Sequence, residues 1–408
     1  MKKFKPFFFS LLALSLLIAL SLEVTYFYLL RQGHNYYQEG KYNKAKQSLQ
    51  KIVHLRLAND RIYQELGLVY EKQGHWEKAA SEYEKALLKG PENFEVHNQL
   101  GLLFYKKNEL DKAIKELKKS LTLNPNQPEI FHQLAIFFYE KDELDKALSN
   151  CQEALSLRPY NQEFISDLNL IIKEINAQKG FSQKESKHFK VFFDPQSEES
   201  SADLVLTLLE KAFKKMHPVI PPFSKYKTVV KIYTNSTFEN LTNQSNQNIV
   251  ASAINSKIML RSPRFLPVSR NLEQILTHEY THLVLHRLIK EQIPVWLNEG
   301  MADFFSRERL SPHQEKRLRE AFLTNNLIPI SRLEKSWKEL NSDQLSLAYA
   351  QAYSLADYLV SEFGWSRLGK LLLELSRGKE IEASLSSSLG ISYSRLENDW
   401  YRHLAHSP

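Results

Sequence analysis

Two histidines and a glutamate in the segment ILTHEYTHLVLH, residues 275–286, have the types and spacing that a catalytic metal site requires. His278 and His282 are four positions apart, so on a helix both imidazoles project from one face and can bind one metal ion. Glu279 is rotated by about 100° from His278, so its carboxylate can reach a water on the metal without being a ligand. Zinc lowers the pKa of its water to about 7, and a glutamate can take that proton as the water attacks a peptide carbonyl.

This short pattern also occurs by chance, and the alternative is an ordinary surface helix with two exposed histidines. A third ligand would favour the metal site. A third histidine six residues after the second is excluded, because position 288 is leucine, and Leu285 replaces the glycine of that pattern. His286 lies a further helical turn along, so we expect it in solvent or beside a ligand.

Glu299 in the segment IPVWLNEGMADFF, residues 293–305, is the candidate for the third ligand. Pro294 suits the first turn of a helix, and on that helix Glu299 and Asp303 share a face. Glu299 can complete a His-His-Glu site that leaves the fourth position for water. Asp303 can hold a ligating imidazole by its other N–H. The alternative for Glu299 is a carboxylate near a helix start, stabilised by the helix dipole.

The two segments together, HEYTH and then WLNEGMAD, resemble the gluzincin metallopeptidases. The closest resemblance is to the peptidase-MA-like family of bacterial proteins, several of which also carry tetratricopeptide repeats. It covers about residues 188–405 and implies that His278, His282 and Glu299 bind Zn²⁺, with Glu279 as the general base.

Relatives in that family use a tyrosine or histidine further along the chain to stabilise the oxyanion. The segment LAYAQAYSLADYLVSEFG, residues 347–364, resembles their downstream helix. Tyr349 and Tyr353 are one helical turn apart, and the Tyr-Ala-Gln run favours Tyr349. The alternative for both is a place in the core, where aromatic residues at helical spacing usually lie. Relatives also hold peptides along the strand before the metal helix; residues 251–260 are the candidate, without the glycine that relatives carry.

Strands followed by helices must position these residues, which predicts an α+β domain over residues 188–405. The metal-binding helix is expected within residues 271–288, which contain neither glycine nor proline. A polar linker, residues 177–187, precedes the domain. The strands are expected at residues 188–193, 228–234 and within 249–260.

A period of 34 residues organises the N-terminal half, marked by Leu66, Leu100 and Leu134. Small residues in register let paired helices approach, and prolines end each unit. The pattern resembles the tetratricopeptide repeat (TPR), in four copies with a capping helix over residues 31–176. Such arrays resemble scaffolds with a groove for a peptide or protein partner; the alternative is a spacer. The other positions in register are Gly67, Gly101 and Ala135; Tyr70, Phe104 and Phe138; Ala79, Ala113 and Ala147; Ala86, Ser120 and Ala154; and Pro91, Pro125 and Pro159.

The N-terminus has the pattern of a targeting segment. Three lysines precede an apolar run over residues 7–22, which Glu23 interrupts and residues 24–30 resume. Residues 1–30 are therefore predicted to be a single transmembrane signal anchor in the cell membrane, with the TPR and peptidase domains on the extracytoplasmic side. The alternative is a signal peptide cleaved near Ala19, which would release a secreted protein.

Composition limits the remaining classes. A chain of 408 residues with 43% hydrophobic and 25% charged residues is expected to form two or three globular domains. The net charge of +7 comes without a basic block interleaved with aromatics, so no nucleic-acid partner is expected. The single cysteine, Cys151, excludes an internal disulfide and fits a small buried residue of a repeat.

The sequence thus predicts a multidomain protein with an N-terminal transmembrane helix, an all-α TPR solenoid and a C-terminal α+β gluzincin-like domain. Its predicted function is that of a membrane-anchored zinc metallopeptidase whose repeats bind the substrate or a partner protein. The alternatives are a TPR scaffold with an inactive metallopeptidase-like domain, and a cell-envelope assembly factor that binds partners through that domain.

Overall fold

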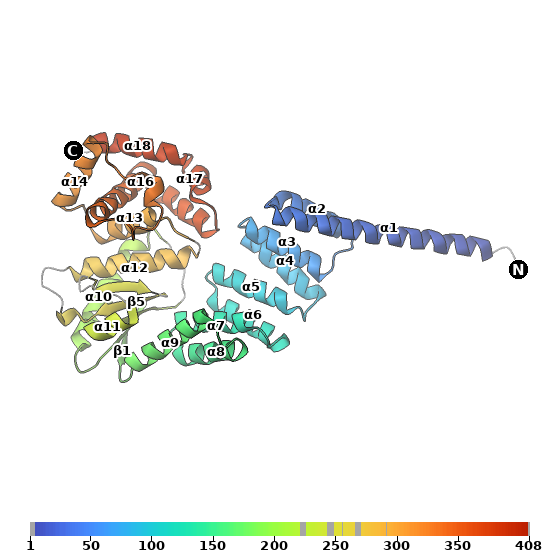
Figure 1. Cartoon of the computed structure of the whole chain (residues 1–408), viewed down its shortest axis with the longest axis horizontal. Coiled ribbons are helices and arrows are strands. Elements are labelled where there is room, and N and C mark those ends of the chain that lie inside the picture. The colour runs from blue at the N-terminus through green and yellow to red at the C-terminus, as the bar shows by residue number, and fades with distance from the viewer. Residues whose placement is uncertain are drawn as a thin grey trace. The chain divides into compact units, whose positions relative to one another are not determined.

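A computed structural model describes residues 5–220, 226–242, 249–254, 256–265, 271–290 and 292–406 (Figure 1). The chain divides into two compact units, Met1–Ile130 and Phe131–Pro408, and each has its own core.

The first unit consists of antiparallel helix pairs that follow the 34-residue period. Glycines at equivalent positions make the close approach possible: a Cβ on Gly67 would lie 2.4 Å from Tyr83, and one on Gly101 would lie 2.6 Å from Leu117. Asparagine caps recur with the same period, since Asn59 accepts from the Ile62 N–H and Asn93 from the N–H three residues on. The helices are α1 (Lys5–Gln38), α2 (Tyr42–His54), α3 (Asp60–Lys72), α4 (Trp76–Lys89), α5 (Phe94–Lys106) and α6 (Leu110–Leu123), and α7 (Pro128–Glu140) begins at its end.

The prediction of a transmembrane helix at residues 1–30 is wrong, and the fold class is corrected accordingly. In the part of the chain that the structure describes, no helix is both long and apolar enough to cross a membrane. Helix α1 continues to Gln38, and its Leu29 and Leu30 are buried with Leu49 of α2 in one apolar cluster. Packing against the next helix of the repeat accounts for the last two apolar residues of the predicted span, whereas others before them, such as Leu20, Val24 and Phe27, are exposed.

The second unit is built on a five-stranded sheet with the order β1-β2-β3-β5-β4. Strands β2, β3 and β5 are parallel, and the two outer strands pair antiparallel to their neighbours. Strand β4 therefore forms one edge of the sheet, where Ser256 with φ 66° lies in the turn to β5. The strands are β1 (Ser182–Glu185), β2 (Phe189–Phe193), β3 (Thr228–Tyr233), β4 (Ala251–Ile254) and β5 (Lys257–Arg261).

Helices cover both faces of this sheet. Because side chains of a strand alternate between the faces, neighbouring residues of one strand contact different helices. Val230 and Ile258 point into the main core with α10 (Glu199–Met216) and α12 (Leu272–Leu288). Their neighbours Lys231 and Lys257 instead contact α9 (Gln162–Ala177) and the turn after α7. Helix α11 (Asn235–Thr242) packs on this second face, and α8 (Leu144–Leu157) packs on α9.

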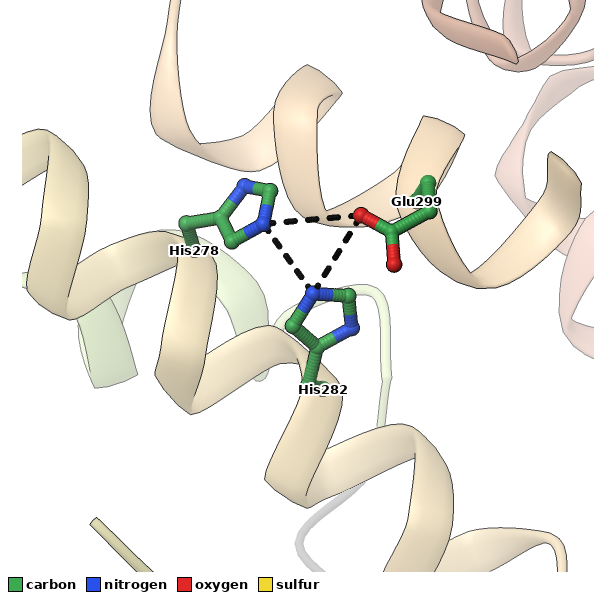
Figure 2. Close-up of side chains that lie close together, drawn as sticks. All are labelled: His278, His282 and Glu299. Atoms are coloured by element: carbon green, nitrogen blue, oxygen red, sulfur yellow. Dashed lines mark hydrogen bonds and ion pairs between the residues drawn. The ribbon is translucent and has the colours of Figure 1, made fainter. Parts of the chain in front are cut away.

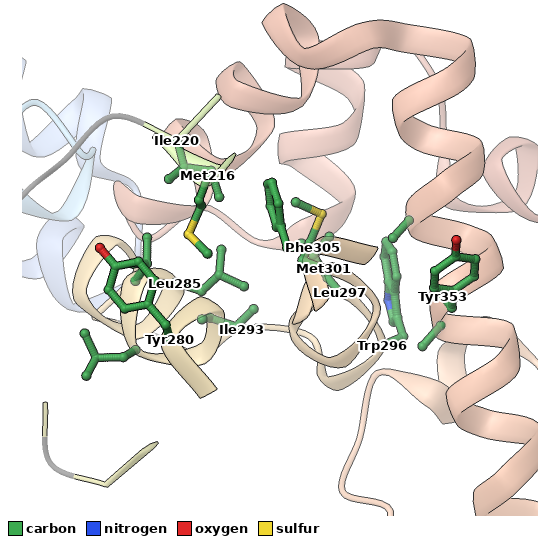
Figure 3. Packing of buried hydrophobic residues seen from close by; sticks show 14 of the residues in the cluster. Met216, Ile220, Tyr280, Leu285, Ile293, Trp296, Leu297, Met301, Phe305 and Tyr353 are labelled. Carbon is green, nitrogen blue, oxygen red and sulfur yellow. The ribbon is translucent and has the colours of Figure 1, made fainter. Parts of the chain in front are cut away.

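A C-terminal group of helices completes the second unit and packs on α12 (Figure 3). Trp296 and Leu297 are fully buried at its centre, and the indole N–H of Trp296 donates to the Tyr393 hydroxyl at 3.0 Å. Gly364, with φ 69°, kinks the long helix α16. The group comprises α13 (Val295–Ser306), α14 (Pro312–Leu323), α15 (Ile330–Leu333), α16 (Ser342–Ser376), α17 (Ile381–Leu389) and α18 (Tyr393–His406). A short 3₁₀ turn, η1 (Pro263–Phe265), lies between β5 and α12.

Candidate metal centre

Helices α12 and α13 bring the three predicted metal ligands together. Asn271 begins α12 by accepting a hydrogen bond from the Gln274 N–H at 3.3 Å, and buried residues such as Leu276 and Leu283 fix one side of this helix in the core. His278 and His282 project from another side toward α13. Because Trp296 and Leu297 anchor the start of α13 in the same core, Glu299 faces both imidazoles.

The donor atoms form a small triangle (Figure 2). The Nε2 atoms of His278 and His282 are 3.0 Å apart, and Glu299 Oε2 lies 3.7 Å from the first and 3.6 Å from the second. The three donor atoms all lie within 4.8 Å of one another. Two imidazole nitrogens and one carboxylate oxygen converging on one point are a donor set suited to a divalent metal ion.

Asp303 orients the His278 imidazole from behind. Nδ1 of His278 lies 3.1 Å from Asp303 Oδ1, the contact predicted for this aspartate. Arg307 in turn binds the other Asp303 oxygen and donates to Gln314 Oε1 at 2.9 Å. Such partners fix the tautomer and the direction of a ligating ring.

Asn298 is the neighbour of the second imidazole. His282 Nδ1 and Asn298 Oδ1 are both buried, and within the described residues neither has a partner at full hydrogen-bond geometry. Asn298 also acts to raise the pKa of His282, against the larger effect of burial, so its side chain lies beside this imidazole.

The pKa values of the ligands reflect burial and mutual charge. Burial, then the charge of His278, lowers the pKa of His282 to about 4. Burial raises the pKa of Glu299 to about 7. Burial alone would lower the pKa of His278, but the hydrogen bond and charge of Asp303 outweigh it, so this pKa is raised. A cation between these groups would favour the carboxylate form of Glu299, so the electrostatics fit a metal ion.

Glu279 lies beside the triangle rather than in it. Its Oε2 accepts a hydrogen bond of 2.7 Å from the backbone N–H of Ala253 in the edge strand β4. Burial raises the pKa of this carboxyl, so it retains a proton more readily than an exposed glutamate does. The carboxylate is thereby held between the metal helix and the edge of the sheet.

The two candidate tyrosines on α16 have different surroundings. Burial, and then the charge of Glu299, raises the pKa of Tyr349, whose ring also packs edge-on against Trp337. Tyr353 donates its hydroxyl to the backbone oxygen of Glu308 at 2.9 Å, and burial raises its pKa to about 12. Tyr349 is thus near the carboxylates of the site, whereas the hydroxyl of Tyr353 is engaged elsewhere.

Gly300 determines how closely α13 approaches α16. A Cβ on this residue would lie 2.3 Å from the backbone oxygen of Ala352 and 3.2 Å from the Ala356 side chain. This close crossing packs α16, which carries Tyr349, against α13, which carries Glu299. The glycine of the sequence NEG is therefore required for packing.

Sequence reasoning missed three contributors to the site: the Ala253 N–H, Asn298 and Arg307. Asn298 precedes Glu299 directly, so its position beside the site could have been inferred from helical spacing. Arg307 is four residues after Asp303, a spacing that pairs opposite charges on a helix. No local signal marks Ala253, because its contact with Glu279 joins residues that are 26 positions apart.

A cleft of about 740 Å³ opens beside the triangle. Its walls come from the end of the chain segment before β4, the first turns of α12 and the connection from α13 to α14. His278, Glu279 and Asp303 line its inner side. The other lining residues are Ile249, Val250, Ala251, Asn271, Gln274, Ile275, Ser306, Arg307, Arg309, Leu310, Ser311 and Pro312.

Comparisons with known proteins agree with this architecture. Residues 254–406 match the family model of the peptidase MA superfamily, and residues 28–59 and 64–128 match tetratricopeptide repeat models. No curated protein matches the chain.

Among solved structures, three chains are examples of similarity at low sequence identity. MamA is 19% identical over 37% of this chain and 83% of its own, with a TM-score of 0.35. The pilF protein of Pseudomonas aeruginosa is 20% identical over 38% of this chain and 71% of its own, also with a TM-score of 0.35. YrrB, titled a TPR protein with an unusual peptide-binding site, is 20% identical over 33% and 69%, with a TM-score of 0.31.

Proposed function

We propose that this chain, which carries a peptidase MA superfamily domain after tetratricopeptide repeats, is a zinc-dependent peptidase that hydrolyses peptide bonds. The observation that supports this most directly is the convergence of His278, His282 and Glu299, with Glu279 held beside them. When bound by these three residues, zinc would supply Lewis acidity toward a peptide carbonyl and increase the acidity of water.

The residues around the metal position have separate tasks in this proposal. Glu279 would take a proton from the water that attacks the peptide carbonyl, and would pass this proton to the amine that leaves as the C–N bond breaks. Burial raises the pKa of this carboxyl, which favours its uptake of a proton. Tyr349 donates a hydrogen bond to the oxyanion that forms on the carbonyl. Asp303 holds the His278 ring, so that its Nε2 points toward Glu299.

The edge strand β4 is proposed to bind the peptide backbone. Alternate residues of an antiparallel strand direct their backbone groups to the same side. The N–H of Ala253 points away from the neighbouring strand, toward Glu279. The N–H and C=O of Ala251 therefore point to the same side, into the cleft. An extended substrate can pair with them, which is a common mode of peptide recognition.

The repeats are proposed to bind the substrate protein or a partner protein, as arrays of this kind present a groove for such ligands. Export of the chain stays a prediction from the N-terminal sequence, and cell fractionation with an antibody checks it.

Metal content and turnover test the proposed function. The purified full chain should bind one zinc ion, and His282→Ala should bind none under the same conditions. Glu279→Gln should retain zinc and lose hydrolysis of a mixed peptide library followed by mass spectrometry. A wild-type chain that binds no zinc after reconstitution would refute the proposal. Bound zinc without hydrolysis of any peptide or protein would instead indicate a binding function for this domain.

A further inference from the structure

Arg309 is the feature of the cleft that the proposed reaction does not use. It lies on the connection between α13 and α14, its side chain is exposed, and it lines the cleft that contains His278 and Glu279. Within the described residues its guanidinium has no hydrogen-bond or ion-pair partner. The nearby Arg307 differs, because it already binds Asp303 and Gln314.

The other charged side chains in the cleft are already engaged. Asp303 is balanced by Arg307 and by its contact with His278. Glu279 accepts the Ala253 N–H and faces the metal position. Arg309 is therefore the one positive charge that lines the cleft without a partner among the described residues. Ser311 and Pro312, at the N-terminus of the 12-residue helix α14, line the same wall and add its partial positive charge.

The remaining wall combines uncharged polar and apolar side chains. Its apolar members include Ile275 on α12 and Ala251 on β4, on the side of the catalytic residues, and Leu310, next to Arg309. A substrate residue in this cleft would therefore meet apolar side chains along its stem and a guanidinium at the wall formed by the α13–α14 connection. Arginine binds carboxylates through two parallel hydrogen bonds, which makes this combination selective for an acidic group.

We propose that the cleft selects peptides with a carboxylate close to the cleaved bond, and that Arg309 determines this specificity. The inference rests on the proposed peptidase function and names its substrate class. The carboxylate has two possible sources, an aspartate or glutamate side chain or the free C-terminus of the peptide. Both offer the same pair of oxygens to the guanidinium.

Matched peptides distinguish these sources. Internally quenched eight-residue peptides would carry glutamate or glutamine at one position at a time, each with a free or an amidated C-terminus. With the zinc-loaded full chain, we expect kcat/KM about tenfold higher for the preferred carboxylate, a typical gain for a charge-assisted hydrogen bond. A gain that follows the side chain indicates an endopeptidase for acidic sites. A gain that follows the free terminus indicates cleavage near C-termini.

Variants assign the preference to Arg309. Arg309→Gln should abolish the difference between glutamate and glutamine peptides while leaving the rate for neutral peptides within about twofold. Arg309→Lys should retain part of the preference, and Arg309→Glu should reverse it toward lysine peptides. Arg319→Gln is the control, because Arg319 is also exposed on α14 but does not line the cleft. Equal rates for acidic and neutral peptides in the wild type would overturn the inference.

Binding provides a readout that does not depend on turnover. Fluorescence anisotropy of the same labelled peptides with the Glu279→Gln chain should show tighter binding of the carboxylate peptide, and added salt should weaken it. Arg309→Gln in that background should remove the difference. If the wild type hydrolyses no peptide, the proposed function fails, whereas this binding difference still decides the inference about Arg309.

Discussion

Glu174 on α9 lies in a fully buried group of charges, and its replacement should destabilise the second unit strongly. Its Oε1 accepts hydrogen bonds from Lys257 at 2.9 Å and from Lys231 at 2.5 Å. Both lysines also bind Asp142, and the Tyr139 hydroxyl donates to Glu174. The side chains of both lysines and of Glu174 have no solvent exposure.

The magnitude follows from the charge balance of this group. Two ammonium groups face two carboxylates, so Glu174→Gln leaves one positive charge buried without compensation. Breaking a buried ion pair in this way costs about 3–5 kcal/mol. The pKa gives a similar figure. Burial would raise the pKa of Glu174, but the charges of Lys257 and Lys231 outweigh it and lower it from 4.5 to about 2. At about 1.4 kcal/mol per pKa unit, this shift corresponds to about 3 kcal/mol.

Urea unfolding of the full chain at pH 7 measures this loss. Tryptophan fluorescence is a suitable signal, because Trp296, Trp337, Trp365 and Trp400 belong to the second unit and Trp76 alone to the first. Glu153→Gln, at an exposed position on α8, is the control and should change the free energy of unfolding by less than about 0.5 kcal/mol.

The pH dependence and a double variant test the cause. The pKa of Glu174 is lower in the folded chain, so its contribution is complete above about pH 4.5 and is lost as the pH falls toward about 2. Glu174→Gln should lack this part of the acid dependence. Combining Glu174→Leu with Lys257→Met leaves Lys231 and Asp142 as a neutral pair, so the double variant should be more stable than Glu174→Gln. If Glu174→Gln unfolds at the same urea concentration as the wild type, the reasoning about this charge group is refuted.

Four further predictions concern the metal centre. Gly300→Ala should lower stability by about 1–3 kcal/mol, measured by urea unfolding, because its Cβ would meet the Ala352 oxygen at 2.3 Å; an unchanged midpoint would contradict this close crossing. Asp303→Asn should weaken zinc binding about 10–100-fold in competition with a chelator, because Asp303 orients His278. Tyr349→Phe should lower kcat about a hundredfold with zinc retained. Tyr353→Phe should mainly lower stability, by about 1 kcal/mol, because it loses the hydrogen bond to Glu308. Equal effects of the two variants on kcat would exclude Tyr349 as the specific oxyanion donor. Ala253→Pro removes the N–H that binds Glu279 at a strand edge that tolerates proline, so kcat should fall while zinc binding and the unfolding midpoint stay near those of the wild type.

Local periodicity explains why much of the site could be predicted from the sequence. His278 and His282 share a face because the helix geometry alone dictates it, and the same holds for Glu299 and Asp303. The placement of each pair on its own helix therefore needs no tertiary information. The prediction that the two helices face each other depended on a resemblance to known peptidases. The distances from Glu299 to the two imidazoles agree with that prediction.

Contacts between distant segments explain what the sequence could not provide. The hydrogen bond from Ala253 to Glu279 depends on the position of β4 at the sheet edge, which no pattern in residues 251–254 encodes. The error at the N-terminus has a related cause. Leu29 and Leu30 at the end of the apolar stretch pack against a neighbouring helix, and local composition does not distinguish such residues from ones that face lipid.

The buried lysines also bear on where the C-terminal domain begins. Lys257 belongs to β5, and β5 pairs with β4, whose Ala253 holds Glu279. The carboxylates that neutralise Lys257 come from segments before the sheet, Asp142 after α7 and Glu174 on α9. A fragment that began at residue 188 would lose both carboxylates and would expose the sheet face that carries Lys231, Lys257, Tyr233 and Met259. The last helices of the repeat region are therefore part of the fold that positions Glu279.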